Sequence, residues 1–84
     1  AMTSIVDLDQ TPDPADVEPK LRALGLTPFE ARIAALVGAA CPPAEVATRL
    51  TLSESTVRST VAAIYAKLGM ARQSQLVQLV TRLR

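Results

Sequence analysis

The feature that most limits the fold of this 84-residue chain is the helical spacing of its apolar residues between start and stop signals. Apolar residues recur at intervals of three and four in several short segments, and no segment alternates as a β-strand does. Threonine, serine and proline open these segments, and glycine closes several of them. The sequence therefore predicts an all-α fold of four helices with an additional short N-terminal helix.

The N-terminal part of the chain divides into two predicted segments. Residues 1–13 contain proline and several acids without a helical period, which indicates a flexible acidic arm or linker. Residues 14–25 predict the short N-terminal helix, because Asp13 can cap it and Pro14 suits its first turn. Pro19 leaves open the alternative that this helix begins only there. Its apolar residues share one face: Val17, Leu21 and Leu24.

The main domain, residues 26–84, opens with the clearest helix start in the chain. Thr27 is a predicted N-cap, Pro28 suits the first helical position, and Glu30 can complete a capping box. This helix is expected to fray near residue 39. Its apolar residues share one face: Phe29, Ile33, Leu36 and Val37.

Two further helices are separated by only three residues. Pro43 opens the segment 43–50, and Thr51 to Ser53 break it. Ser53 caps a longer helix that ends at Leu68 before Gly69. This longer helix has an apolar stripe: Val57, Val61, Ile64 and Leu68. A fourth helix at about 74–83 turns four residues inward: Leu76, Leu79, Val80 and Leu83.

A short turn before a capped, amphipathic helix is typical of a helix-turn-helix. The outward positions of the longer helix are small except for one arginine: Ser55, Arg58, Ser59, Ala62 and Ala66. Small side chains let a helix approach DNA closely, and the Arg58 guanidinium can pair with guanine O6 and N7. The same spacing also fits an ordinary solvated helix face, so both interpretations stay open from spacing alone.

Charge is distributed unevenly along the chain. Residues 1–24 carry five acids and two bases, whereas residues 25–84 carry seven bases and three acids. An acidic arm is therefore joined to a basic body, which is the part that a nucleic acid would meet. A solvated surface of mixed charge explains the same counts, so charge alone does not identify a partner.

The residues that metal, nucleotide or catalytic sites need are few. The chain has no histidine, one cysteine, no glycine-rich phosphate loop and no clustered carboxylates, so we expect neither a cofactor nor enzymatic activity. Cys41 is expected to be an inert core residue. No segment approaches the length of a membrane span and no signal peptide is present, so we expect a cytoplasmic protein without a membrane partner.

Five short motifs occur in a fixed order: Leu-Thr-Pro-Phe-Glu-Ala at 26–31, Glu-Val-Ala-Thr-Arg-Leu at 45–50, Ser-Glu-Ser-Thr-Val-Arg-Ser at 53–59, Ile-Tyr-Ala-Lys-Leu-Gly at 64–69 and Gln-Leu-Val at 75–77. In this order they resemble the LuxR-type family of helix-turn-helix DNA-binding domains, also called GerE-type or NarL-like. The resemblance covers residues 26–80 without a gap. Region four of sigma factors begins similarly but lacks the motif at 64–69.

This resemblance implies sequence-specific binding of double-stranded DNA in its major groove during transcription regulation, without a cofactor. It also implies that the chain is the C-terminal effector domain of a larger bacterial regulator with an upstream sensory domain. The DNA-binding positions that it implies are Ser55, Thr56, Arg58, Ser59, Thr60, Ala62 and Lys67. In the family the fourth helix pairs two domains, which implies a weak homodimer through Gln73, Val77, Thr81 and Arg84.

The chain departs from the family pattern at the start of its second helix. Pro42, Pro43 and Ala44 stand where the family has a serine cap followed by polar and basic phosphate ligands. Ala40 replaces the usual glycine after the first helix, and alanine tolerates a left-handed backbone poorly. Ala62 also replaces a residue that is often basic. These departures keep an alternative open, a protein–protein interaction or dimerisation module with weak or no DNA binding.

Overall fold

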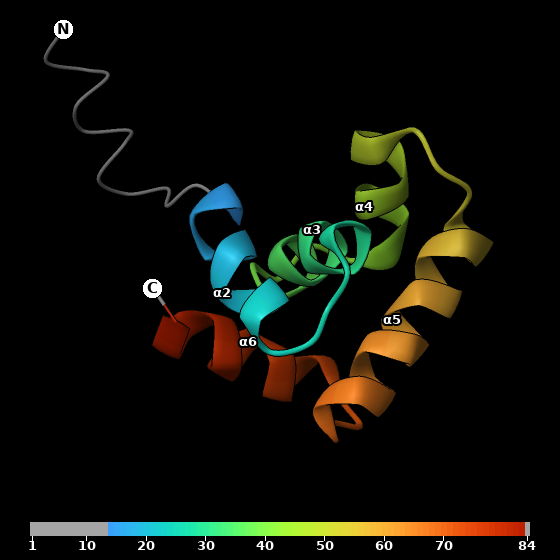
Figure 1. The fold of residues 1–84 in the computed structure, drawn as a ribbon. Helices are drawn as coiled ribbons and strands as arrows, with labels where there is room; N and C mark the ends of the chain where they lie inside the picture. Colours follow the sequence, from blue (N-terminus) through green and yellow to red (C-terminus); the bar gives the residue numbers. More distant parts are fainter. Residues whose placement is uncertain (1–13, 84) are drawn as a thin grey trace, which may run out of the picture.

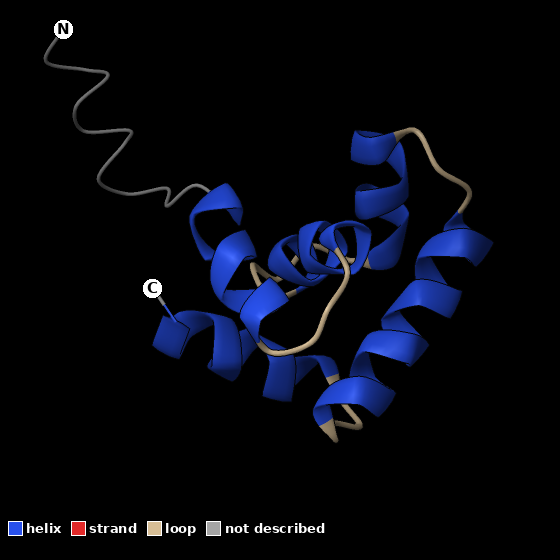
Figure 2. Cartoon of the chain, viewed as in Figure 1, coloured by secondary structure: helices blue, strands red, loops and turns tan. Residues whose placement is uncertain are grey.

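The structure, a computed structural model, describes residues 14–83, and all of its regular elements are helices (Figures 1 and 2). The 3₁₀ turn and the five α-helices are η1 (Pro14–Val17), α2 (Glu18–Ala23), α3 (Pro28–Val37), α4 (Pro43–Leu50), α5 (Glu54–Leu68) and α6 (Gln73–Leu83). The prediction of an all-α domain with an additional short N-terminal helix is confirmed. Over the described range no helix is long and apolar enough to cross a membrane.

The N-terminal helix forms in two parts. A 3₁₀ turn at Pro14–Val17 precedes α2, whose first turn contains Pro19 at a position that needs no backbone donor. Val17 and Leu21 are completely buried, but Leu24 is 46% exposed, so the shared apolar face is buried only in part. Leu24 follows the last turn of α2, where the chain leaves the helix toward Gly25. The predicted cap, Asp13, lies outside the described residues.

The middle of the fold is α3, which contacts η1, α2, α4, α5 and α6 (Figure 1). Its last part is buried without interruption from Ile33 to Gly38, and two alanines in that run let neighbouring helices come close. Phe29 shares the apolar face of this helix but is 45% exposed. It shares the helical spacing of Ile33 but lies in the first turn, at the open end of the helix, where its neighbours leave it uncovered.

A close approach of α6 to α3 depends on Gly38. A Cβ atom at this position would lie 2.3 Å from Cγ2 of Val80, which is far inside van der Waals contact. Val80 and Leu76 are the buried residues of α6. Leu79 and Leu83 pack against the core while partly exposed, so the predicted inward face of this helix is confirmed. Lys20 on α2 adds a hydrogen bond from its ammonium to the carbonyl of Leu83.

Four helices of the described range end next to a residue with positive φ, and two of these residues are not glycine. They are Gly25 after α2 (φ 106°), Ala40 after α3 (φ 70°), Thr51 after α4 (φ 57°) and Gly69 after α5 (φ 68°). After α3, the amide of Cys41 donates to the carbonyl of Leu36 at 3.1 Å, and the amide of Ala40 donates to that of Val37. This pattern is the Schellman motif. Ala40 therefore adopts the conformation that its side chain disfavours, because the motif satisfies carbonyls that the helix end leaves open.

Candidate nucleic-acid interface

Helices α4 and α5 pack against each other across the predicted three-residue turn. Leu52 in this turn donates its amide to the carbonyl of Ala47 at 2.9 Å, and Thr51 supplies the left-handed residue. Figure 1 shows the turn leading into α5, which runs along one edge of the molecule. The arrangement is that of a helix-turn-helix, with α5 in the place of the recognition helix.

The start of α5 is fixed by Ser53. Its hydroxyl oxygen accepts a hydrogen bond from the amide of Thr56 at 3.1 Å, as the sequence predicted. The same hydroxyl lies 2.8 Å from the Thr56 hydroxyl, to which it donates. One turn later the Thr60 hydroxyl donates to the carbonyl of Thr56 at 2.9 Å. Both threonine hydroxyls therefore have partners within the chain, and each oxygen keeps acceptor capacity.

Helix α5 has a buried back and an exposed front. Val57, Val61 and Ile64 are buried, and Leu68 packs against the core from a partly exposed position. The residues predicted to face DNA lie on the other side: Ser55, Thr56, Arg58, Ser59, Ala62 and Lys67 are exposed, and Thr60 is half-buried. Their exposure makes them accessible to a ligand, and their contact with DNA stays a prediction. A stripe of small side chains around one arginine is what this face offers chemically.

Each cation on the two helices of this unit has a carboxylate partner. Arg49 on α4 lies 2.8 Å from Glu45, one helical turn earlier, in an i, i+4 pair. Arg58 pairs with Glu54 in the same way on α5. Lys67, at the far end of α5, lies 2.7 Å from Glu30. A phosphate group that uses one of these cations must therefore compete with a carboxylate.

The pair between Lys67 and Glu30 ties two helices together. Oε1 of Glu30 also accepts a hydrogen bond from the backbone amide of Thr27 at 2.9 Å. The backbone amide of Glu30 donates to Oγ1 of Thr27 at 3.1 Å, and the two bonds together form the predicted capping box of α3. The hydrogen bond from Lys67 and that from the Thr27 backbone lower the pKa of the Glu30 carboxyl below its ordinary value. Lys67 thus links the end of α5 to the start of α3 in addition to its predicted place beside DNA.

The start of α4 lacks the capping that the family pattern leads one to expect. Pro42 is the N-cap residue and makes no side-chain cap hydrogen bond. Cys41 before it is buried, as predicted, and burial raises the pKa of its thiol above the ordinary value. The Cys41 thiol donates a hydrogen bond to Oε2 of Glu45, with the sulfur 3.7 Å from that oxygen. Pro42 and Ala44 are exposed there without offering a phosphate ligand.

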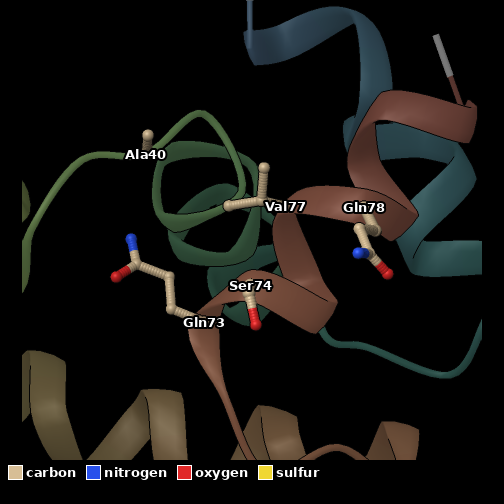
Figure 3. Close-up of a pocket in the computed structure, with 5 residues that line it drawn as sticks. All are labelled: Ala40, Gln73, Ser74, Val77 and Gln78. Carbon is tan, nitrogen blue, oxygen red and sulfur yellow. The ribbon is translucent and has the colours of Figure 1, made fainter.

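The predicted dimer residues on α6 differ in their exposure and in the hydrogen bonds that they make within the chain. Val77 lies beside Ser74 and Gln78 at a shallow hollow that extends to Ala40 and Gln73 (Figure 3). The Gln73 amide donates to the carbonyl of Val37 at 3.1 Å and to that of Cys41 at 3.4 Å. Gln73 therefore closes the end of α3. Thr81 is exposed and donates its hydroxyl to the Val77 carbonyl, and Arg84 lies outside the described residues.

Sequence reasoning missed the carboxylate partners of Arg58 and Lys67. The spacing of Glu54 and Arg58, four residues apart on one helix, is a signal that could have found the first pair. Glu30 and Lys67 are 37 residues apart, and no local pattern connects them. Among residues 14–83, no group of three histidine, cysteine, aspartate or glutamate side chains is placed to hold a metal ion.

One family of known sequences matches this chain. It is described as bacterial regulatory proteins of the luxR family, and the match covers residues 25–80. The matched range includes α3, α4 and α5 and most of α6, and it leaves η1 and α2 outside. No curated protein and no solved structure matches the chain.

Proposed function

We propose, because the chain belongs to the luxR family of bacterial regulatory proteins, that it binds a specific sequence of double-stranded DNA and thereby regulates transcription. Family membership supports helix-turn-helix DNA binding as the general function. The observation that carries the proposal is α5, whose buried stripe fixes it to the core while its exposed face carries small side chains around Arg58. A major groove about 12 Å wide admits such a helix.

The proposed contacts divide into base and phosphate contacts. Arg58 reaches base edges, flanked by the small residues Ser59 and Ala62, which allow the helix backbone to approach. Thr56 and Thr60 are the proposed phosphate contacts, and the Thr60 hydroxyl must turn from the Thr56 carbonyl to donate to a phosphate. Ser55 is exposed at the start of the same face. Lys67 lies near the DNA backbone at the far end of α5. Glu30 competes for its ammonium there, so its contribution is expected to be small.

Further parts of the proposal concern the assembly and the rest of the protein. We propose a weak homodimer on DNA through α6, with Val77 and Thr81 at its centre and Gln73 and Arg84 beside them. Val77 is half-buried at a hollow on this helix, which supports a contact there. So small a patch lies well below a standard interface, so pairing is expected on DNA and not in free solution. Val77→Glu should then weaken DNA binding and leave the helical circular dichroism unchanged.

The larger context follows from the family in the same way. We propose that the chain is the C-terminal effector domain of a bacterial regulator, working in the cytoplasm and controlled by a sensory domain upstream.

A second candidate function has a specific observation in its favour. The cations Arg49, Arg58 and Lys67 are all paired with carboxylates, and the start of α4 offers no basic side chain. Phosphate contacts provide most non-specific affinity for DNA, so a surface neutralised in this way also fits a protein–protein interaction module that binds DNA weakly or not at all.

A salt titration separates the two candidates. Binding of the full chain to a mixed-sequence 30-base-pair duplex would be followed by fluorescence anisotropy. The salt concentration would range from about 50 to about 200 mM, because the affinity of protein–DNA complexes falls steeply over this range. DNA binding predicts measurable affinity at low salt and an affinity that falls with added salt, with a log–log slope of about −0.9 for each phosphate that a cation neutralises. Absence of binding at the lowest salt would favour the interaction module.

A further inference from the structure

Arg58, the cation on the exposed face of α5, is held by a carboxylate one helical turn earlier. Its Nε donates to Oε2 of Glu54 at 2.9 Å, and its Nη2 donates to the same oxygen. The side chains of Arg58 and Glu54 are 67% and 44% exposed, so the pair lies on the surface that faces outward. Glu54 is also in the first turn of α5, where the helix dipole favours a negative charge.

The contact occupies one edge of the guanidinium and leaves another edge free. Arginine has five N–H donors, and Glu54 takes the Nε–H and one N–H of Nη2. The two N–H groups of Nη1 and the second one of Nη2 remain. One N–H of Nη1 and the remaining N–H of Nη2 form the end-on edge of the guanidinium, and these two parallel donors match O6 and N7 of guanine.

The other outward side chains on α5 are too small to orient Arg58. Ser55, Ser59 and Ala62 surround it on this face, and in the described part of the chain the side-chain hydrogen bonds of Arg58 go to Glu54 alone. An arginine that is free to sample its rotamers loses that freedom when it binds. Glu54 is thus the group that limits the positions of the guanidinium before DNA arrives.

We propose that Glu54 is a positioning residue for Arg58, which it holds with the end-on edge toward the base pairs, so that Glu54 increases sequence specificity while it weakens overall affinity. The inference rests on the proposed DNA binding. The negative charge of Glu54 repels phosphates in specific and non-specific complexes alike, so this effect cancels in the ratio of the two affinities. The orientation of Arg58 matters only where a base is read, so it changes the ratio.

Helix α4 supplies a matched control. Glu45 and Arg49 form a pair with the same spacing and with similar exposure, 44% and 54%. The first helix of a helix-turn-helix crosses the DNA backbone and leaves base reading to the second. Removal of Glu45 should therefore change electrostatic repulsion without changing how a base is read.

The experiment uses the full chain and two duplexes. One is the duplex that the unmodified protein selects from a random library, and the other is a shuffled duplex of the same composition. Glu54→Ala should strengthen binding to the shuffled duplex and lower the ratio of affinities about three- to tenfold. This exceeds the roughly twofold effect of a solvated surface pair, because DNA excludes water from the contact. Glu54→Gln keeps an acceptor oxygen, so it should gain the same non-specific affinity and retain most of the ratio. Glu45→Ala should strengthen both complexes and leave the ratio unchanged.

The outcomes separate this inference from the proposed function. An unchanged ratio in Glu54→Ala, with a lower ratio in Arg58→Ala, would overturn the positioning role and leave DNA binding intact. If Arg58→Ala also kept the ratio, Arg58 would read no base and the inference would be wrong. If the unmodified protein selected no duplex, the proposed function and this inference would both fail. Circular dichroism of each variant verifies the fold, and Glu54→Ala combined with Arg58→Ala should show no further loss beyond Arg58→Ala alone.

Discussion

Helices α3 and α5 both carry apolar residues at helical spacing, yet the structure buries them to different extents. In α3 and the glycine that follows it, every residue from Ile33 to Gly38 is buried. Helix α5 has fifteen residues, and only Val57, Val61 and Ile64 are buried. In a helical segment that is enclosed on all sides any change of volume lowers stability, whereas a helix with one buried stripe can change on its exposed side at little cost. The residues that hold this small domain together are therefore distinct from the exposed residues proposed to contact DNA.

The largest expected effect is at Ile33, which is completely buried in α3. Ile33→Ala removes side-chain volume from the centre of the fold and should lower the free energy of unfolding by about 2–5 kcal/mol. Urea unfolding followed by circular dichroism measures this. Ser59→Ala on the open face of α5 is the matched change, expected to stay within about 0.5 kcal/mol. Equal losses in the two variants would erase the contrast between the helices.

Gly38 tests the tight contact between α3 and α6. Gly38→Ala places a Cβ atom against Val80, 2.3 Å from Cγ2 before any relaxation, and should destabilise the fold by about 1–3 kcal/mol. The same urea experiment applies. Val80→Ala should cost less in the Gly38→Ala background than alone, because the clashing methyl is then gone. Additive costs would show that the two positions do not meet.

The helix ends offer a change that should increase stability. Ala40 has φ 70° at the end of α3, where glycine avoids the steric cost of a side chain. Ala40→Gly should raise the free energy of unfolding by about 0.5–1 kcal/mol, measured by thermal and urea unfolding. The opposite change, Gly69→Ala after α5, should lower it by a similar amount. No gain at Ala40 would mean that its left-handed backbone is not strained.

The smallest expected effect on stability is at Glu30, which joins the start of α3 to the end of α5 through its ion pair with Lys67. The folded protein lowers the pKa of this carboxyl, so its contribution is present above the unfolded pKa and is lost as pH falls through the folded one. Stability should thus decline in the acid range below about pH 4.3, the ordinary value for glutamate. Glu30→Gln should show a shallower decline in urea midpoints measured between neutral pH and that range. An identical decline in both proteins would contradict the assigned cause.

Local signals in the sequence predicted much of the fold. Thr27, Glu30 and Ser53 cap helices as expected, and Gly69 ends α5, because caps depend on residues three or four positions away. Leu24 and Phe29 lie on predicted apolar faces and are exposed, since spacing places a residue on a face but does not say where the neighbouring helices end.

The candidate site was predictable to a similar degree. Local periodicity identified the exposed face of α5 and the position of Arg58 on it. The partner of Lys67 depends on how α3 packs beside α5, and the role of Gln73 in closing α3 depends on how α6 docks. Such contacts join residues far apart in the sequence, so no periodicity within one helix indicates them.

We expect Arg58 to bind DNA while other residues hold the fold. Arg58→Ala tests this expectation when affinity for the selected duplex and the free energy of unfolding are measured on the same preparation. We expect binding to weaken by about 1–3 kcal/mol, with relaxed preference at one base pair. We expect stability to change by no more than about 0.5 kcal/mol, the value of an exposed i, i+4 pair. Unchanged affinity for DNA would contradict the account and place α5 outside the groove.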